Sequence, residues 1–74
     1  MIKINPNYLH LFKKFSNCYN YMVAPGVWLT FDTPDLDYIG VNYFYLPHNM
    51  KELEGRANDT LNRLIADSIL EVID

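Results

Sequence analysis

The chain has one cysteine, Cys18, and two histidines, His10 and His48, among its 74 residues. A single cysteine excludes an intramolecular disulfide, and these three side chains cannot supply the four ligands of a structural zinc site. A nucleophilic pair of Cys18 with either histidine would need a third group to orient the base, and no motif of that kind accompanies them. The three glycines are too far apart to form a phosphate-binding loop. We therefore predict a protein that is not an enzyme and has no catalytic residue, no metal site and no cofactor.

Long hydrophobic runs are absent as well. No apolar run approaches the ~20 residues that are needed to span a bilayer. The opening residues Met1 to Asn5 lack the charged and apolar regions of a secretory signal. These features predict a cytoplasmic protein with no membrane partner. A chain of this length forms one domain, residues 1–74, and domains of this size often need stabilisation beyond their own core.

Charge is scarce and unevenly distributed. The net charge is −3. The only charged residues are lysines in 1–25 and aspartates in 26–48, and residues 49–74 contain six acidic and three basic side chains. An acidic chain with few cations is poorly suited to nucleic-acid phosphates, and −3 is too small a charge for a nucleic-acid mimic. Asn, Tyr and Ile are frequent, as in chains from AT-rich genomes, which favours an origin in a phage or mobile element.

The first predicted element is a helix over about residues 6–22. Asn5 is a suitable cap, and Pro6 fits the first helical position because its missing N–H is not needed there. One apolar stripe recurs at spacings of 4, 3, 4 and 3, and comprises Tyr8, Phe12, Phe15, Tyr19 and Met22. Ser16, Asn17 and Asn20 favour helices poorly, so the helix could instead end near Phe15 and continue as an extended segment.

Two strands are predicted next, over about residues 27–32 and 38–46. Both runs are rich in β-branched and aromatic residues, and a polar break over residues 33–37 separates them. In the first strand Val27, Leu29 and Phe31 share one face, and Trp28 lies on the other. Neither face of the second strand is polar. The two runs therefore predict a β-hairpin with apolar residues on both faces.

The last predicted element is a helix over about residues 49–72. Asn49 followed by Glu52 resembles a capping box. A broad apolar stripe continues to the end of the chain and comprises Met50, Leu53, Ala57, Leu61, Leu64, Ile65, Ile69 and Val72. The expected fold is α+β: a single small domain, helix–β-hairpin–helix, with both helices on one face of a short antiparallel sheet.

Three aspartates, Asp32, Asp35 and Asp37, lie in and beside the predicted hairpin loop. Carboxylates at this density could hold a hard cation, but a calcium loop also needs a glycine at its sixth position and a closing glutamate. Aspartate is common in turns, because its side chain bonds to nearby backbone N–H groups. The spacing therefore favours a turn over a metal site.

These features together predict a small non-enzymatic protein-binding module, a regulator or inhibitor of a larger host protein. The predicted partner-binding residues are Trp28, Tyr38 and Phe44 on the hairpin, with Asp35 and Asp37 as an acidic rim. Exposed Trp and Tyr residues are frequent among those that dominate binding energy. The alternative function is nucleic-acid binding through Lys13, Lys14 and the aromatic rings of the first helix.

Self-association is a further expectation. A two-stranded sheet has two unpaired edges, and pairing of two copies around a two-fold axis would give a homodimer with a four-stranded sheet. The alternative is a monomer in which a third strand, about Asn20 to Val23, covers one edge.

Overall fold

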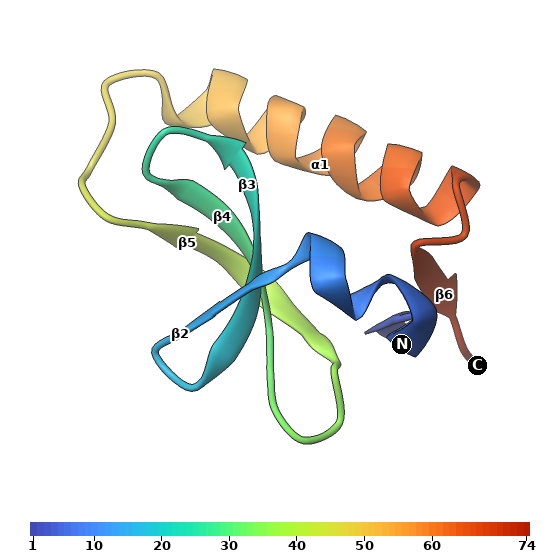
Figure 1. Ribbon diagram of the computed structural model, residues 1–74. Coiled ribbons are helices and arrows are strands. Elements are labelled where there is room, and N and C mark those ends of the chain that lie inside the picture. Colours follow the sequence, from blue (N-terminus) through green and yellow to red (C-terminus); the bar gives the residue numbers. More distant parts are fainter.

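The computed structural model describes all residues from 1 to 74. Along the chain the elements are β1 (Ile2–Ile4), the 3-10 helix η1 (Pro6–Leu11), β2 (Lys13–Phe15), β3 (Cys18–Ala24), β4 (Val27–Phe31), β5 (Tyr38–Tyr43), α1 (Met50–Ala66) and β6 (Leu70–Val72). Strands β2, β3, β4 and β5 form an antiparallel sheet in that order, and β1 pairs with β6 in a second, two-stranded sheet. Helix α1 lies across one face of the larger sheet (Figure 1).

The predicted helix–hairpin–helix fold is wrong, although the class α+β is correct. The molecule has one main helix and six strands in two sheets, so two helices on one face of a hairpin are not found. Most of the regular structure is strand, and the β1–β6 pair brings the first and last strands side by side (Figure 1).

The error arises over residues 6–22, where a long helix was expected. Asn5 does cap a helix, since its side chain accepts the N–H of Asn7 at 3.1 Å, but that helix is 3-10 and ends at Leu11. The rest is a β-hairpin that turns at Ser16 and Asn17, which have φ values of 50° and 60°. Two consecutive residues with positive φ match the twist of a two-residue hairpin, and asparagine tolerates this conformation.

Strands β4 and β5 lie where the hairpin was expected, with β5 ending at Tyr43 rather than at residue 46. Strand β3 pairs with β4, so a third strand covers one edge of the hairpin, over a longer range than Asn20 to Val23. The β4–β5 ladder contains a bulge, because Thr30 pairs with Gly40 while Phe31 pairs with Tyr38. Ile39 is the extra residue, and the bulge turns Tyr38 to the same face as Phe31.

The final helix was expected to continue to residue 72, but α1 ends at Ala66. Ser68 has a φ of 62°, and the chain reverses there into β6, where Leu70 is buried. Ile69 and Val72 satisfy helical spacing by coincidence, because Ile69 precedes β6 and Val72 lies at its end, where it is 58% exposed. The capping box is also incomplete: the Asn49 side chain donates to Glu52 Oε2 at 3.4 Å and bonds no backbone N–H.

The core lies between the larger sheet, α1 and the β1–β6 pair. Its main cluster comprises Ile4, Phe12, Leu29, Phe31, Ala57, Leu64 and Leu70, and a smaller one comprises Ala24, Val27 and Leu53. Phe12 and Phe31 meet edge to face, with ring centroids 5.4 Å apart. Leu64, from the predicted apolar stripe of the last helix, is fully buried in the main cluster. Helix α1 lacks the length and apolarity that crossing a membrane would require.

Candidate protein-binding surface

The face of the larger sheet that points away from α1 is called the outer face here. Val27, Leu29 and Phe31 alternate toward the core, so Trp28 and Thr30 between them lie on the outer face. Met22 on β3 and Asn42 on β5 are the cross-strand neighbours of Trp28 and share its face. Met22 is 54% exposed. The outer face therefore combines a half-buried tryptophan with an exposed methionine.

Three aromatic rings from three strands or their ends meet on this face. Trp28 lies with its ring centroid 5.0 Å from Phe15 and 6.1 Å from Phe44, and these two are 5.6 Å apart. Phe15 ends β2 and Phe44 directly follows β5, so the two rings reach Trp28 from the two edge strands of the sheet, on the same face. We call these three residues the outer aromatic cluster. The Nε1 atom of Trp28 is buried and has no hydrogen-bond acceptor in the chain.

A buried polar pair lies on the same face. Asn20 Oδ1 accepts a hydrogen bond from Thr30 Oγ1 at 2.9 Å. Asn20 Nδ2 lies within hydrogen-bond distance of three backbone carbonyl oxygens, those of Cys18, Lys13 and Phe15, at 3.0, 3.3 and 3.4 Å. These bonds tie the β2–β3 hairpin to β4 and hold Phe15 in place for its contact with Trp28.

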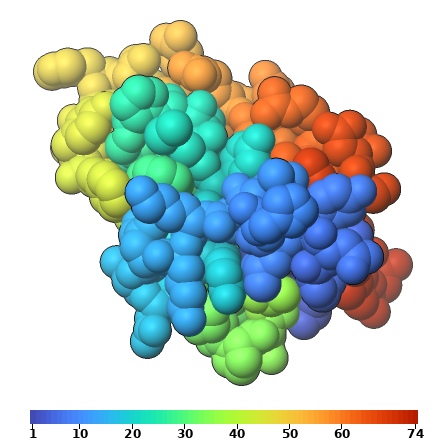
Figure 2. Space-filling view, viewed as in Figure 1, coloured from blue at the N-terminus to red at the C-terminus, as the bar shows by residue number.

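The segment after β5 exposes further apolar area at the end of the sheet near the β3–β4 turn. Phe44, Tyr45 and Leu46 are 61%, 58% and 86% exposed. The segment is anchored by two bonds to the β3–β4 turn: Phe44 N–H donates to the carbonyl of Gly26, and the Tyr45 hydroxyl donates to the carbonyl of Pro25, both at 2.9 Å. In the space-filling view this part of the chain, in yellow-green to yellow, forms one margin of the molecule (Figure 2).

Tyr38 does not join this surface. Its ring packs against Phe31, with centroids 5.4 Å apart, at the edge of the core. Burial raises the pKa of the Tyr38 phenol above its ordinary value, and the nearby Tyr43 adds a smaller effect of the same sign. Of the three predicted aromatic site residues, the structure thus brings Trp28 and Phe44 together and places Tyr38 on the opposite face.

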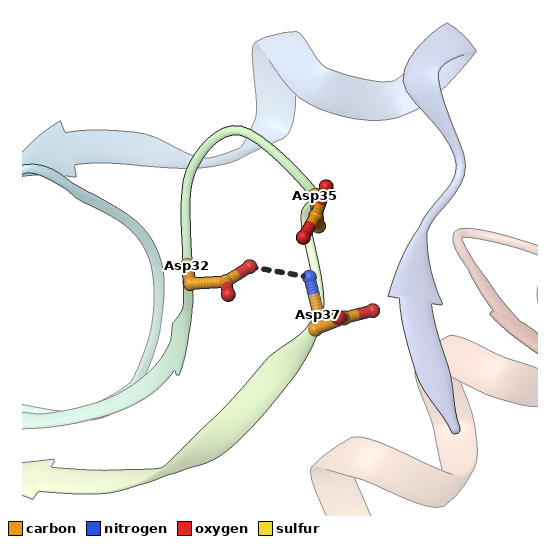
Figure 3. A group of neighbouring side chains, drawn as sticks. All are labelled: Asp32, Asp35 and Asp37. Atoms are coloured by element: carbon orange, nitrogen blue, oxygen red, sulfur yellow. Dashed lines mark hydrogen bonds between the residues drawn. The ribbon is translucent and has the colours of Figure 1, made fainter.

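The aspartates are brought together in the β4–β5 loop (Figure 3), with carboxylate oxygens of Asp32, Asp35 and Asp37 within 4.8 Å of one another. Asp32 Oδ1 accepts the backbone N–H of Asp37 at 2.9 Å, which is a turn-stabilising bond. Asp37 also forms an ion pair with Lys3, at 3.1 Å between Nζ and Oδ1, and Lys3 bonds the carbonyl of Asp35. Two of the three carboxylates therefore have structural roles, and Asp35 is the exposed one.

The lysines of the alternative function lie on a strand and not on a helix. Lys13 and Lys14 are consecutive in β2 and point to opposite faces. Lys14 Nζ lies 5.7 Å from the centroid of the Tyr19 ring, while Phe12 is buried in the core. The structure therefore does not bring two lysines and a set of exposed rings onto one surface.

Phe15 and Met22 belong to the outer face although the sequence analysis assigned them to a helical stripe. The signal that locates them is the pair Ser16–Asn17, which separates two short alternating segments. Comparison with protein-family models, with curated proteins and with solved structures finds no match for this chain.

Proposed function

We propose that the protein is a non-enzymatic protein-binding module whose contact surface is the outer face of the larger sheet. The observation that carries the proposal is the outer aromatic cluster, together with the exposed side chain of Met22, the cross-strand neighbour of Trp28. Contiguous apolar area of this kind is unfavourable in water, and it marks surfaces that other proteins cover. Tryptophan, tyrosine and methionine are also enriched in the centres of protein interfaces.

The anchoring of the surface supports this role. Phe15, Trp28 and Phe44 already contact one another, so a partner would meet rings whose rotamers are largely fixed. Fixed rings lose little conformational entropy on binding, which is why such residues often dominate the binding energy. Asp35 is exposed in the loop at the far end of β4 from Trp28 and gives this end of the sheet an acidic group. A partner with a basic group at that position would associate faster.

The function we infer for such a module is regulation or inhibition of a larger protein, of the kind that phages and mobile elements encode. Its support is the small size of the chain, its apolar contact surface and its composition. A regulator needs only a surface that covers a site on its target, and it requires no chemistry of its own.

The test is a comparative affinity capture from an extract of the source organism. Wild type, Phe44→Ala, Met22→Lys and a control, Val72→Ala, are used as baits. Val72 is 58% exposed on β6, away from the outer face, so its change removes apolar area elsewhere. We expect wild type and the control to capture the same polypeptide, and the two outer-face variants to lose it. The captured protein is then purified, and its affinity for each variant is measured.

Equal affinity for all four baits would contradict the proposal. Retention of the protein on heparin that is lost by about 0.2 M salt would favour nucleic-acid binding instead, because contacts to phosphates weaken steeply with salt.

A further inference from the structure

The free side of β5 is an edge of the larger sheet that no other strand covers along most of its length. Strand β4 pairs with the other side of β5, and β1 lies beside only the start of the free side, where Lys3 bridges Asp37 and Ile4 N–H donates to the carbonyl of Leu36. Helix α1 packs over β3 and β4 and leaves this edge unobstructed. The free edge therefore begins after Tyr38 and runs from Ile39 to Tyr43.

The hydrogen-bond pattern shows which backbone groups face outward. Phe44 N–H donates to the carbonyl of Gly26, which sets the phase of the β4–β5 ladder. Bonded pairs alternate along an antiparallel ladder, so Asn42 and Gly40 also face β4. The N–H and C=O groups of Val41 and Tyr43 therefore point away from the sheet, where the chain provides no partner for them.

Strand β5 has few of the features that usually keep an edge strand from pairing with another chain. Residues 38–47 contain no charged side chain, and β5 contains no proline. The bulge at Ile39, with Gly40 at a φ of 137°, affects only the start of the strand and leaves residues 41–43 regular. Ile39 is itself 58% exposed, and a hollow of about 270 Å³ lies beside it, lined by Thr30, Ile39, Gly40, Val41 and Asn42. An uncharged edge with exposed apolar side chains is a template for pairing with another strand.

We propose that the occupant of this edge is the same edge of a second copy, paired antiparallel around a two-fold axis at Val41. This register places Ile39 opposite Tyr43 of the other copy, so two exposed isoleucines are covered at once. The pairing joins two four-stranded sheets into one, with both α1 helices on the same side and away from the contact.

Charge favours a second copy as the occupant. Each chain carries −3, yet the paired segments are neutral, and the two acidic β4–β5 loops lie at opposite ends of the shared ladder. Stable dimers bury roughly 1,200–2,000 Å² in total, more than a five-residue ladder supplies alone. The exposed Ile39 side chains of the two copies add further apolar area to the ladder. The proposal does not depend on the binding of another protein to the outer face.

The test measures the mass of the full chain by sedimentation across concentrations up to the high micromolar range. Wild type should rise from 8.7 kDa toward twice that value. Ile39→Lys should remain at 8.7 kDa, because a lysine on an edge strand opposes pairing. The matched control is Met22→Lys, which makes the same change at a similarly exposed residue of β3, separated from the free edge by β4, and should dimerise as wild type does.

Amide hydrogen exchange provides a second readout of the same proposal. The N–H groups of Val41 and Tyr43 should become protected as concentration rises, whereas those of Gly40 and Asn42 should be protected at all concentrations. A wild-type mass of 8.7 kDa at every concentration would overturn the proposal. So would a dimer that survives Ile39→Lys and is lost in Met22→Lys, since it would use the outer face. The partner-capture experiment is independent, because Met22→Lys should lose the partner and keep the dimer.

Discussion

At the scale of single residues, Asn20 has the largest structural role for a polar side chain. It is only 1% exposed, yet both ends of its amide are bonded, to Thr30 and to carbonyl groups of the β2–β3 hairpin. A buried amide is tolerated because these bonds replace those it would make to water. Asn20 also affects the outer face, because it holds the β2–β3 hairpin in place and this hairpin positions Phe15 against Trp28.

Asn20→Ala should therefore lower the free energy of unfolding by about 1–3 kcal/mol, because it leaves the Thr30 hydroxyl and buried carbonyl groups without their partner. The matched control is Asn42→Ala on the exposed outer face of β5, which should change stability by less than about 0.5 kcal/mol. Urea unfolding followed by circular dichroism measures both values. Equal effects of the two variants would show that the buried bonds of Asn20 add nothing.

At the scale of elements, local sequence pattern predicted those parts whose neighbours in sequence are also their neighbours in space. Strands β4 and β5 follow from dense β-branched and aromatic runs, and α1 follows from a long apolar stripe with Leu64 at its centre. Residues 8–22 are different. Their aromatic spacing fits a helix, while Tyr19 and Tyr21 also alternate toward Phe31 and Leu29 across the sheet. Pairing with β4 favours the strand over the helix, and local residue spacing does not reveal that pairing.

The residues of the candidate surface also differ in whether local sequence could place them. Trp28 and Phe44 could be placed on one face by simple alternation along their strands. Tyr38 could not, because the bulge at Ile39 shifts it by one residue and turns it toward Phe31. Phe15 could be found only once the β2–β3 hairpin was known.

Two glycines provide a prediction about elements, because the same substitution should have opposite effects in them. Gly26 in the β3–β4 turn has a φ of 75°, and a Cβ there would meet the Tyr45 ring. Gly26→Ala should destabilise the protein by about 1–2 kcal/mol and loosen the segment that carries Phe44. Gly55 lies inside α1 with open space around it, so Gly55→Ala should stabilise by about 0.5–1 kcal/mol. Thermal unfolding measures both changes, and a stabilising Gly26→Ala would contradict the assigned turn geometry.

At the scale of the whole molecule, the β1–β6 pair joins the sheet to the helix. Leu70 and Ile4 pair with each other and belong to the main core cluster. Ile4 N–H donates to the carbonyl of Leu36 in the β4–β5 loop, and Asn5 N–H donates to the carbonyl of Ile69. Residues from both sheets and from α1 thus share one core, and we expect them to unfold together.

Leu70→Ala tests this cooperativity. Leu70 is 1% exposed, so its truncation leaves a cavity in the main cluster and should cost about 2–5 kcal/mol, a large part of the stability of a domain this small. Val72→Ala on the same strand is the control, because Val72 is exposed and should contribute less than about 0.5 kcal/mol. Circular dichroism reports mainly on α1, and fluorescence reports on Trp28 on the far face of the sheet. The two signals should change in one coincident transition, at a lower denaturant concentration in Leu70→Ala than in the control. Loss of the helix signal while the Trp28 signal stays native would show instead that α1 and β6 unfold independently of the larger sheet.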